Sequence, residues 1–523
     1  MKKTIFAFSP MFLGICLLLC AQSQLLSSQA NLSKEETTLL KVAAGIHHIF
    51  ENSHDQIWPG YDLSKHPYVV YLPGEWVLYL NAEQAPDNFS PYPEDWPDLG
   101  TRAFIHRGIY KDLAGQFEFD FQIGSDTTFA MGLPKQLLFS FDKPAFMLLS
   151  TTIHEGFHQY QRHHFGEIPW AREEIYPIQD TPNTALASLE MHILRDALRA
   201  MHENSREKVS ELLKQFAAVR THRWTISDPY IQKYEQGQEI NEGTARFVEM
   251  KSMECALKLM NKETNAALLN DLRKDLKDLS IKELLEEDMK NRLTGDAVAP
   301  EDMLRNRIYP VGSTLGFLCD FLNIEWKMKF QGAGPEVSFS GLLLQHFGLD
   351  EAQLCSYLEK AKIDYGYESI HSASQNLIRD YLKSYDEALQ KFNIQSGIEV
   401  EFSLSSNGLQ RFRSSRAKKW VVDQGQVTLC LNYNLYSLKK GNVTLEVHNK
   451  GIFDQTDWEK KRKKVIFFAD EISSVKVDGE TVSEEKPMER NFNQIQIIGD
   501  DFKLEIKTQG HLSIQDNKIT ITI

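Results

Sequence analysis

The chain has 523 residues, of which 42% are hydrophobic and 25% are charged, and its formal net charge is −14. At roughly 100–200 residues per domain, this length predicts two or three domains and allows a substantial hydrophobic core. The ordinary globular balance excludes a disordered, collagen-like or mostly membrane-embedded chain. The acidic charge argues against nucleic acid or an anionic lipid as a partner bound through the overall field of the protein.

The first residues have the form of a secretory leader. Lys2 and Lys3 supply a positive start, Met11–Cys20 is apolar, and small residues follow at the positions that a signal peptidase reads. The apolar stretch is shorter than the about 20 residues that span a bilayer. We therefore expect a signal peptide over residues 1–23 and an exported protein, periplasmic or secreted, that keeps no transmembrane span.

A cysteine at the end of the leader gives an alternative localisation. Acylation of Cys20 would anchor the mature chain in a membrane, but Leu19 stands where lipoprotein signal peptidases prefer a small residue. The later cysteines are widely separated and form no Cys-x-x-Cys pair: Cys255, Cys319, Cys355 and Cys430. That spacing disfavours a cysteine-based zinc site or redox motif, and we expect buried, small apolar residues instead.

Residues 60–141 are predicted to be rich in strands. A helix over Lys34–Asn52 comes first, and strand-like runs follow that we interpret as half-buried strands. The clearest runs are Tyr68–Leu72, Trp76–Leu80 and Phe117–Phe121. Proline and glycine are frequent between these runs, as turns require.

Residues 142–393 have helical periodicity. Their apolar side chains recur with the spacing of amphipathic helices. The long periodic stretches are Ala185–Met201, Glu207–Val219, Glu242–Met260 and Ser374–Phe392. This region is therefore predicted to be helical almost throughout.

The period of the pattern changes to two over residues 396–523. Turn signals recur between the apolar runs, at Asn407-Gly408, Gly441-Asn442, Asp478-Gly479 and Asp516-Asn517. These signals predict hairpins and an antiparallel β domain that is sandwich- or barrel-like. The basic run Lys460–Lys464 is expected to be a solvated face. The expected fold class of the whole chain is α+β.

The motif His154-Glu155-x-x-His158 is the most informative stretch of the sequence. It lies in a segment with helix signals, since Pro144 suits a first turn and Gly166 suits a position beyond the end. Histidines four residues apart stand on the same face of a helix, so their imidazoles can chelate one Zn²⁺. Glu155 is placed beside them to accept a proton from an attacking water.

A catalytic zinc needs a third protein ligand. His164 would complete the metzincin spacing, but that spacing requires a glycine where this chain has Gln161. If the helix continues, His164 lies about 15 Å further along the axis than His154 and cannot reach the same ion. We therefore interpret His163 and His164 as surface residues or as outer partners of the site.

A second motif, Asn241-Glu242-Gly243-Thr244-Ala245, lies well downstream. Together the two motifs resemble the gluzincin zinc peptidases, which include the thermolysin-like and the leukotriene-hydrolase-like aminopeptidase groups. The resemblance implies a zincin-like catalytic region over residues 24–395. The Gly-Ala-Met-Glu-Asn strand of the aminopeptidase group is absent, which weakens an assignment to aminopeptidases.

The resemblance also implies roles for individual residues. One Zn²⁺ per chain would be held by His154, His158 and Glu242, and Glu155 would be the general base. The small residues of the second motif, among them Gly243, suit a close approach of its helix to the helix that carries the histidines.

Three other acids remain open as partners of the site. Thermolysin-like enzymes have an acid that orients a histidine where this chain has Arg246, so Glu249, Glu239 or Glu190 is expected to take that role. Glu239 and Glu249 are also alternative third ligands, because they share a helix face with Glu242. The competing interpretation of both is ordinary solvated helix charge.

A hydrogen-bond donor for the oxyanion is expected as well. Tyr309 lies just before an apolar helix expected over Thr314–Leu322. The glutamate-ligand families often place a catalytic tyrosine at a comparable point in the chain, so the resemblance implies this role for Tyr309. The alternative is a tyrosine satisfied in the core or in a turn.

From these observations we expect an exported zinc-dependent peptidase that acts on a peptide or protein substrate. The alternative belongs to another class of protein. It is a non-catalytic exported envelope or binding protein that holds a structural metal or no metal.

Overall fold

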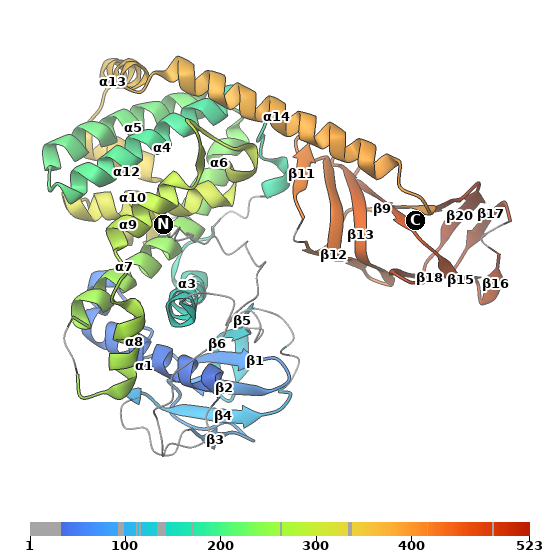
Figure 1. Cartoon of the computed structure of the whole chain (residues 1–523), viewed down its shortest axis with the longest axis horizontal. Coiled ribbons are helices and arrows are strands. Elements are labelled where there is room, and N and C mark those ends of the chain that lie inside the picture. The colour runs from blue at the N-terminus through green and yellow to red at the C-terminus, as the bar shows by residue number, and fades with distance from the viewer. Residues whose placement is uncertain are drawn as a thin grey trace. The chain divides into compact units, whose positions relative to one another are not determined.

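The computed structural model describes residues 33–92, 99–110, 113, 117–132, 143–168, 172–261, 264–332, 337–415, 417–483 and 486–523. The predicted leader and Cys20 lie outside these ranges. The chain forms two compact units: the first comprises Met1–Ala171 and Ala185–His371, and the second comprises Arg172–Thr184 and Ser372–Ile523. Helices and a small sheet build the first unit, and a large sheet builds most of the second (Figure 1), which confirms the α+β class.

A six-stranded sheet in the first unit has the order β3-β4-β2-β1-β6-β5. β1 and β6 pair in parallel, whereas β5 and β6 pair antiparallel and leave β5 at the edge of the sheet. The strands are β1 (Tyr68–Leu72), β2 (Trp76–Leu80), β3 (Ser90–Pro91), β4 (Ala103–Arg107), β5 (Phe117–Ile123) and β6 (Asp126–Gly132).

β1 and β2 occupy the predicted ranges but are buried along their whole length, so the half-buried interpretation is wrong for them. They lie at the centre of the sheet, where both faces are covered. Val69 and Tyr71 join an apolar cluster on one face. Tyr68 points to the opposite face and stacks on Phe129. β5 has the expected mixed burial.

The helices follow the predicted stretches closely and extend most of them by a few residues. They are α1 (Lys34–Ile57), α3 (Pro144–His164), α4 (Thr181–His202), α5 (Arg206–Ile226), α6 (Pro229–Gln238), α7 (Thr244–Leu259), α8 (Ala267–Leu276), α9 (Ile281–Lys290), α10 (Arg305–Leu322), α11 (Lys327–Gly332), α12 (Phe339–Phe347), α13 (Glu351–Asp364) and α14 (Tyr367–Asn393). A short hairpin of β7 (Leu293–Thr294) and β8 (Ala297–Val298) interrupts the helical region. None of the described helices is both long and apolar enough to cross a bilayer.

α3 lies between the small sheet and α7 (Figure 1) and packs on α1, α7, β5 and β6. Its apolar stripe enters an aromatic core, where the ring of Phe157 lies 5.0 Å from Trp58 and 5.1 Å from Tyr61. Pro144 stands at the start of the helix, as predicted. This packing holds the backbone of α3 firmly from both sides, so side chains on its remaining face have fixed positions.

A sheet of thirteen strands builds the second unit. Its strands are β9 (Ile398–Ser405), β10 (Gln410–Ser414), β11 (Lys419–Val422), β12 (Val427–Lys440), β13 (Val443–Asp457), β14 (Arg462–Ala469), β15 (Ile472–Val477), β16 (Glu480–Val482), β17 (Met488–Phe492), β18 (Ile495–Gly499), β19 (Phe502–Ile506), β20 (Gly510–Gln515) and β21 (Lys518–Thr522). The strands begin where the period-two pattern begins, but the compact unit also includes part of α14 and the distant segment Arg172–Thr184.

Three of the predicted turn signals join paired antiparallel strands, namely Gly441-Asn442, Asp478-Gly479 and Asp516-Asn517. The prediction is wrong for Asn407-Gly408, because β9 pairs with β14 and β21 while β10 pairs with β12. β9 and β21 also run parallel, which departs from a purely antiparallel domain. Local turn chemistry therefore indicates a turn at Asn407-Gly408 but not the partner of each strand.

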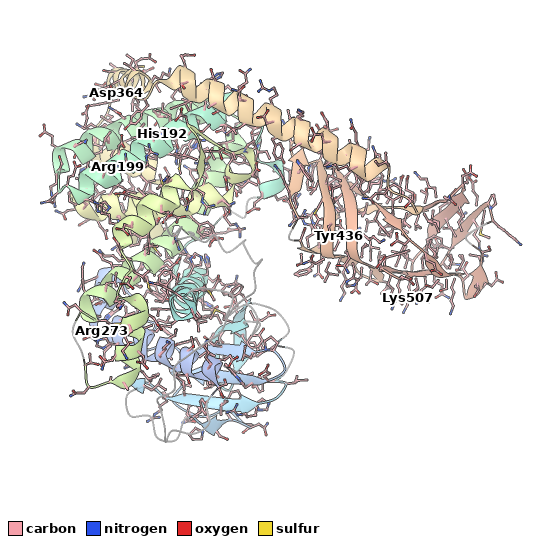
Figure 2. The ribbon with its side chains drawn as sticks, in the orientation of Figure 1. His192, Arg199, Arg273, Asp364, Tyr436 and Lys507 are labelled. Carbon is pink, nitrogen blue, oxygen red and sulfur yellow. The ribbon has the colours of Figure 1, made fainter. Side chains whose placement is uncertain are left out.

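Part of the basic run in the second unit is buried rather than solvated. Lys463 is 2% exposed on β14, where alternate residues point inward, and its Nζ contacts the Asp454 carboxylate. The hydroxyl of Tyr436, which Figure 2 labels within this unit, donates to the same carboxylate at 2.7 Å. Burial lowers the pKa of Lys463 to about 8 against the attraction of Asp454.

The cysteines after the leader are all free. Cys255, Cys319 and Cys430 are buried, as predicted, whereas Cys355 is exposed on α13. The expectation of buried apolar residues is therefore wrong for Cys355.

Candidate metal centre

α3 presents His154 and His158 on one face, as the four-residue spacing predicts. Their Nε2 atoms lie 3.1 Å apart, and the rings meet edge to face with centroids 4.7 Å apart. His154 is 4% exposed, and the His158 side chain is 13% exposed. Both imidazoles thus point the same nitrogen at one small volume inside the first unit.

Glu242 reaches this volume from the π-helical turn Glu239–Gly243, which joins α6 to α7. Its Oε2 lies 3.5 Å from Nε2 of His154 and 3.3 Å from Nε2 of His158. In the described part of the chain, these three side chains form a group close enough to hold one metal ion. The structure therefore brings together the three ligands that the two motifs imply.

The spacing of the three ligand atoms suits a tetrahedral ion. Two ligand atoms at about 2.0–2.1 Å from one tetrahedral zinc are about 3.3 Å apart. The observed separations of 3.1, 3.3 and 3.5 Å lie around that value. Oε2 of Glu242 is also buried, and its contacts with the two histidines do not have hydrogen-bond geometry. A cation between these atoms would satisfy an oxygen whose burial is otherwise costly.

Close packing of α7 against α10 fixes the π turn. A Cβ atom at Gly243 would lie 2.9 Å from Cα of Gly312, and one at Gly312 would lie 2.5 Å from Cα of Gly243. The expected close approach of Gly243 is thus to α10 and not to the helix that carries the histidines. π turns are frequent at functional sites because they re-aim side chains within an otherwise regular helix.

The charges of the group hold one another in place. Burial alone would raise the pKa of Glu242, but the charge of His158 and the contacts with both histidines keep it well below its usual range. Burial alone would lower the pKa of His154, but contacts with Glu242 and Glu249 raise it to about 10. The acids around His154 therefore make this volume attractive to positive charge.

Glu155 follows His154 on α3 and is 7% exposed. Burial raises its pKa above the usual value, and the neighbouring charges of His158 and His154 oppose that rise. A carboxyl group with a raised pKa beside a metal site is suited to take up and return a proton near neutral pH.

Glu249 orients His154 and does not belong to the metal group. Its Oε2 accepts a hydrogen bond from Nδ1 of His154 at 3.3 Å, which directs Nε2 toward the candidate metal position. Ser150 and Arg246 both donate to its other oxygen. Arg246 and His154 lower the pKa of Glu249 to about 2 against burial. Arg246 also pairs with Asp288 at 3.0 Å.

The other candidate acids contact arginines. Glu239 pairs with Arg220 at 2.6 Å, and Glu190 pairs with Arg223 at 2.7 Å. Neither acid belongs to the metal group or contacts a ligand histidine. Glu239 and Glu249 are 1% and 4% exposed, so the interpretation as solvated helix charge is wrong for both.

Tyr309 lies inside α10 and not ahead of its helix, because the helix begins at Arg305 and accommodates Pro310. The Tyr309 ring is 4% exposed, and its centroid lies 5.7 Å from that of His154. Burial and the nearby charge of Glu242 raise its pKa well above the usual value, so the hydroxyl keeps its proton as a donor. Tyr309 thus lies beside the metal group, as expected, but its helix begins earlier than predicted.

Arg305 belongs to neither sequence motif but also lies at the site. Its Nη1 lies 3.4 Å from Oε1 of Glu242, the oxygen that does not face the histidines. Arg305 stands one helical turn before Tyr309, so the two share a face of α10. Once Tyr309 is assigned to a helix, the four-residue spacing points to Arg305.

His163 and His164 lie away from the group, as predicted. Nε2 of His163 lies 2.8 Å from the Asp120 carboxylate on β5, and the His164 ring stacks on Tyr160. β5 is the sheet edge nearest the centre, and its Phe119 ring lies 6.3 Å from the ring of His158. A register shift between Glu118 and Phe121 bends the strand at this point.

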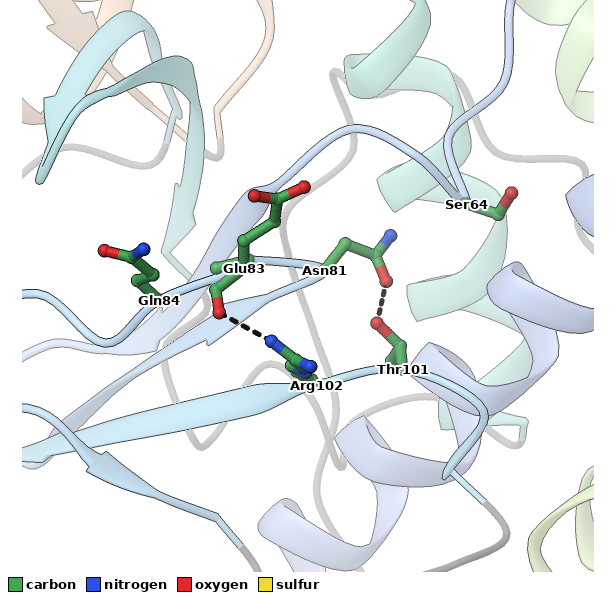
Figure 3. A pocket seen from close by; sticks show the side chains of 7 residues that line it. Ser64, Asn81, Glu83, Gln84, Thr101 and Arg102 are labelled. Carbon is green, nitrogen blue, oxygen red and sulfur yellow. Dashed lines mark hydrogen bonds between the residues drawn. The ribbon is translucent and has the colours of Figure 1, made fainter.

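A separate shallow pocket of about 600 Å³ lies at one end of the small sheet, among the loops that follow β2 and precede β4 (Figure 3). The pocket is polar. Two hydrogen bonds join residues that line it: Arg102 donates to the Glu83 carbonyl at 2.8 Å, and Thr101 donates to Asn81. None of the three candidate ligands lines it.

No protein-family model, curated protein or solved structure matches this chain.

Proposed function

We propose that this protein is a zinc-dependent peptidase of the gluzincin type. The observation that carries the proposal is the convergence of His154, His158 and Glu242 at tetrahedral spacing, with the buried Glu155 next to them in the chain. Two histidines and one glutamate are a ligand set of catalytic zinc, which keeps a fourth position for water or substrate. A structural zinc site has four protein ligands, and the described residues provide three.

In this proposal, different residues of the chain carry out different steps of hydrolysis. When bound, zinc would lower the pKa of water and polarise the peptide carbonyl. Glu155 would accept a proton from the attacking water and pass it to the nitrogen of the departing amine. Tyr309, whose hydroxyl stays protonated, would donate to the carbonyl oxygen as negative charge develops there.

The edge strand β5 supports a peptide as the substrate. Among the described strands it pairs with β6 and stands last in the strand order, the position at which an extended chain can add to a sheet. Phe119 of this strand lies beside His158, so a chain bound there would lie next to the candidate ligands. The substrate would add a strand to the sheet and present a peptide bond to Glu155.

Export belongs to the same proposal. It rests on the leader form of the first residues, with Lys2 and Lys3 ahead of an apolar stretch. Processing after residue 23 would release the protein to the periplasm or the medium, and acylation at Cys20 would tether it instead. The N-terminal sequence of the protein recovered from cells distinguishes the two.

The function is tested by comparing wild type with Glu155→Gln on a mixture of unfolded peptides. We expect the variant to keep its zinc and to lose about 10²–10⁴-fold in rate, because only the proton acceptor is removed. Glu167→Gln, an exposed acid beyond the end of α3, is the matched control and should keep full activity. Equal hydrolysis by wild type and Glu155→Gln, insensitive to a chelator, would reject the peptidase.

A further inference from the structure

Gln161 joins the two elements that carry the candidate ligands. It lies on α3, nearly one turn after His158, and is 2% exposed. Its Oε1 lies 2.7 Å from Nδ1 of His158. Its Nε2 donates to the carbonyl oxygens of Ile240 at 3.0 Å and Asn241 at 2.9 Å, and to the hydroxyl of Thr244 at 2.8 Å.

These contacts allow one orientation of the amide. The two N–H bonds of Gln161 face carbonyl oxygens, which can only accept, so its oxygen must face the imidazole. Nδ1 of His158 is then the donor, and Nε2 keeps the lone pair that a metal ligand needs. Glu249 holds Nδ1 of His154 in the same way. The two histidines thus have different partners at Nδ1, and both present Nε2 to the candidate metal position.

The amide also holds the π turn. Ile240 and Asn241 immediately precede Glu242 in the turn Glu239–Gly243. Carbonyl groups need a donor when they are buried, and a π turn departs from the regular bonds of the helix around it. Bonds from Gln161 to two successive carbonyls therefore fix the backbone from which the Glu242 side chain starts.

We propose that Gln161 is a positioning residue of the metal centre that sets the tautomer of His158 and the placement of Glu242 together. The inference rests on the proposed function, because it presumes that these side chains bind zinc. Nδ1 of a ligand histidine usually has a partner of its own, and losing that partner typically weakens metal binding 10- to 100-fold. Gln161 serves one ligand directly and a second through the backbone.

The test compares the zinc affinity of the full-length protein with that of Gln161→Met, measured by competition with a chromogenic chelator. Methionine keeps the length of the side chain and removes both kinds of hydrogen bond. We expect the dissociation constant for zinc to rise about 10- to 100-fold. The matched control is Gln215→Met, since Gln215 is 1% exposed and its amide donates to Asp364 at 3.2 Å, away from the ligands.

Unfolding of each variant in excess chelator separates positioning from simple stability. A merely structural glutamine would lower the unfolding midpoint of Gln161→Met and leave its zinc affinity at the wild-type value, which would overturn the inference. Absorption of bound Co²⁺ gives a second readout, and we expect Gln161→Met to shift the visible bands while Gln215→Met does not. Wild type that binds no zinc would reject the metal centre itself, an outcome distinct from a zinc-binding Gln161→Met with unchanged affinity.

A second variant serves if Gln161→Met does not fold. Gln161→Glu keeps an oxygen toward His158 but has no N–H for the carbonyls of Ile240 and Asn241. A carboxylate partner would by itself strengthen His158 as a ligand, so a zinc affinity below that of wild type would come from the π turn. An affinity equal to that of wild type would contradict the proposed placement of Glu242 by Gln161.

Discussion

Two buried clusters of charged side chains share the π turn Glu239–Gly243, and they differ in how closely their charges pair. The arginine–glutamate cluster consists of Glu190, Arg220, Arg223, Glu235, Glu239 and Arg307, all 0–1% exposed. Its ion pairs are tight, with Arg220 to Glu239 and Arg223 to Glu235 both at 2.6 Å. The metal cluster consists of His154, His158 and Glu242, whose acid–imidazole separations are 3.3 and 3.5 Å.

The comparison shows that burial of charge does not by itself mark a functional site. Buried ions are stabilised when an opposite charge lies in direct contact, and the arginine–glutamate cluster meets that condition. In the metal cluster the ligand atoms stand apart by about the edge of a zinc tetrahedron. Glu239 and Glu242 are three residues apart on the same turn, yet one braces α5 and the other faces α3.

The largest effect is expected from a substitution that removes a member of the metal cluster. Losing a hydrogen-bond partner of a metal ligand weakens metal binding by up to about 100-fold. Glu242→Gln removes a ligand itself, so it should weaken zinc binding by more than about 100-fold. Hydrolysis should fall with it, whereas unfolding in excess chelator should not become easier. Chelator competition and denaturant titration give the two values. Glu254→Gln, a half-buried acid on α7 that pairs with lysines, is the control. Tight zinc binding by Glu242→Gln would contradict the assignment.

The arginine–glutamate cluster should respond in the opposite way. Glu235→Gln removes one partner of Arg223, which keeps Glu190, and takes from Arg307 the carboxylate that it pairs with. An uncompensated buried guanidinium costs about 3–5 kcal/mol of unfolding free energy. The zinc affinity of the folded protein should stay at the wild-type value. The same titrations measure both quantities. Unchanged stability together with weakened zinc binding would show that the two clusters do not have separate roles.

Tyr309→Phe sharpens the comparison by separating catalysis from binding. The phenyl ring keeps the packing on His154 and loses only a contact with Glu242, so the zinc affinity should change far less than in Glu242→Gln. The rate of hydrolysis should fall about 10²–10³-fold, as when one donor to a developing oxyanion is removed. Steady-state kinetics with a saturating peptide measure this loss in kcat. A variant as active as wild type would exclude Tyr309 as the donor.

The smallest expected effect is a dependence of zinc affinity on pH. Because neighbouring acids raise the pKa of His154 to about 10, this imidazole carries a proton below that pH, and zinc must displace it. Binding should therefore weaken about tenfold for each unit of pH lost per displaced proton. Competition titrations at pH 6, 7 and 8 measure the slope. An affinity that does not change across this range would contradict the assigned charges of the cluster.

The sequence predicts local features of the site well and distant ones poorly. The shared face of His154 and His158 follows from helical spacing, and Glu242 follows from the resemblance of a short motif. The π turn does not follow, since it depends on the contact between Gly243 and Gly312. Periodicity describes one helix at a time and cannot pair residues across helices.

The same limit explains the other departures. The arginine–glutamate cluster draws its members from helices far apart in sequence, so each acid resembles solvated charge until the helices are packed together. In the second unit, turn signals located the hairpins, but pairing of β9 with β21 brings together the two ends of the domain. The segment Arg172–Thr184 joins that unit through Glu174, which contacts Arg411 and Arg413. Local sequence patterns do not predict contacts between segments that are far apart in the chain.

The most direct test of the metal centre is a crystal structure of the protein with X-ray data collected on both sides of the zinc absorption edge. We predict one anomalous peak per chain, bonded to Nε2 of His154, Nε2 of His158 and a carboxylate oxygen of Glu242, with Nδ1 of His154 still on Glu249. Absence of a peak at these atoms after soaking with zinc, or a peak held by other residues, would contradict the account.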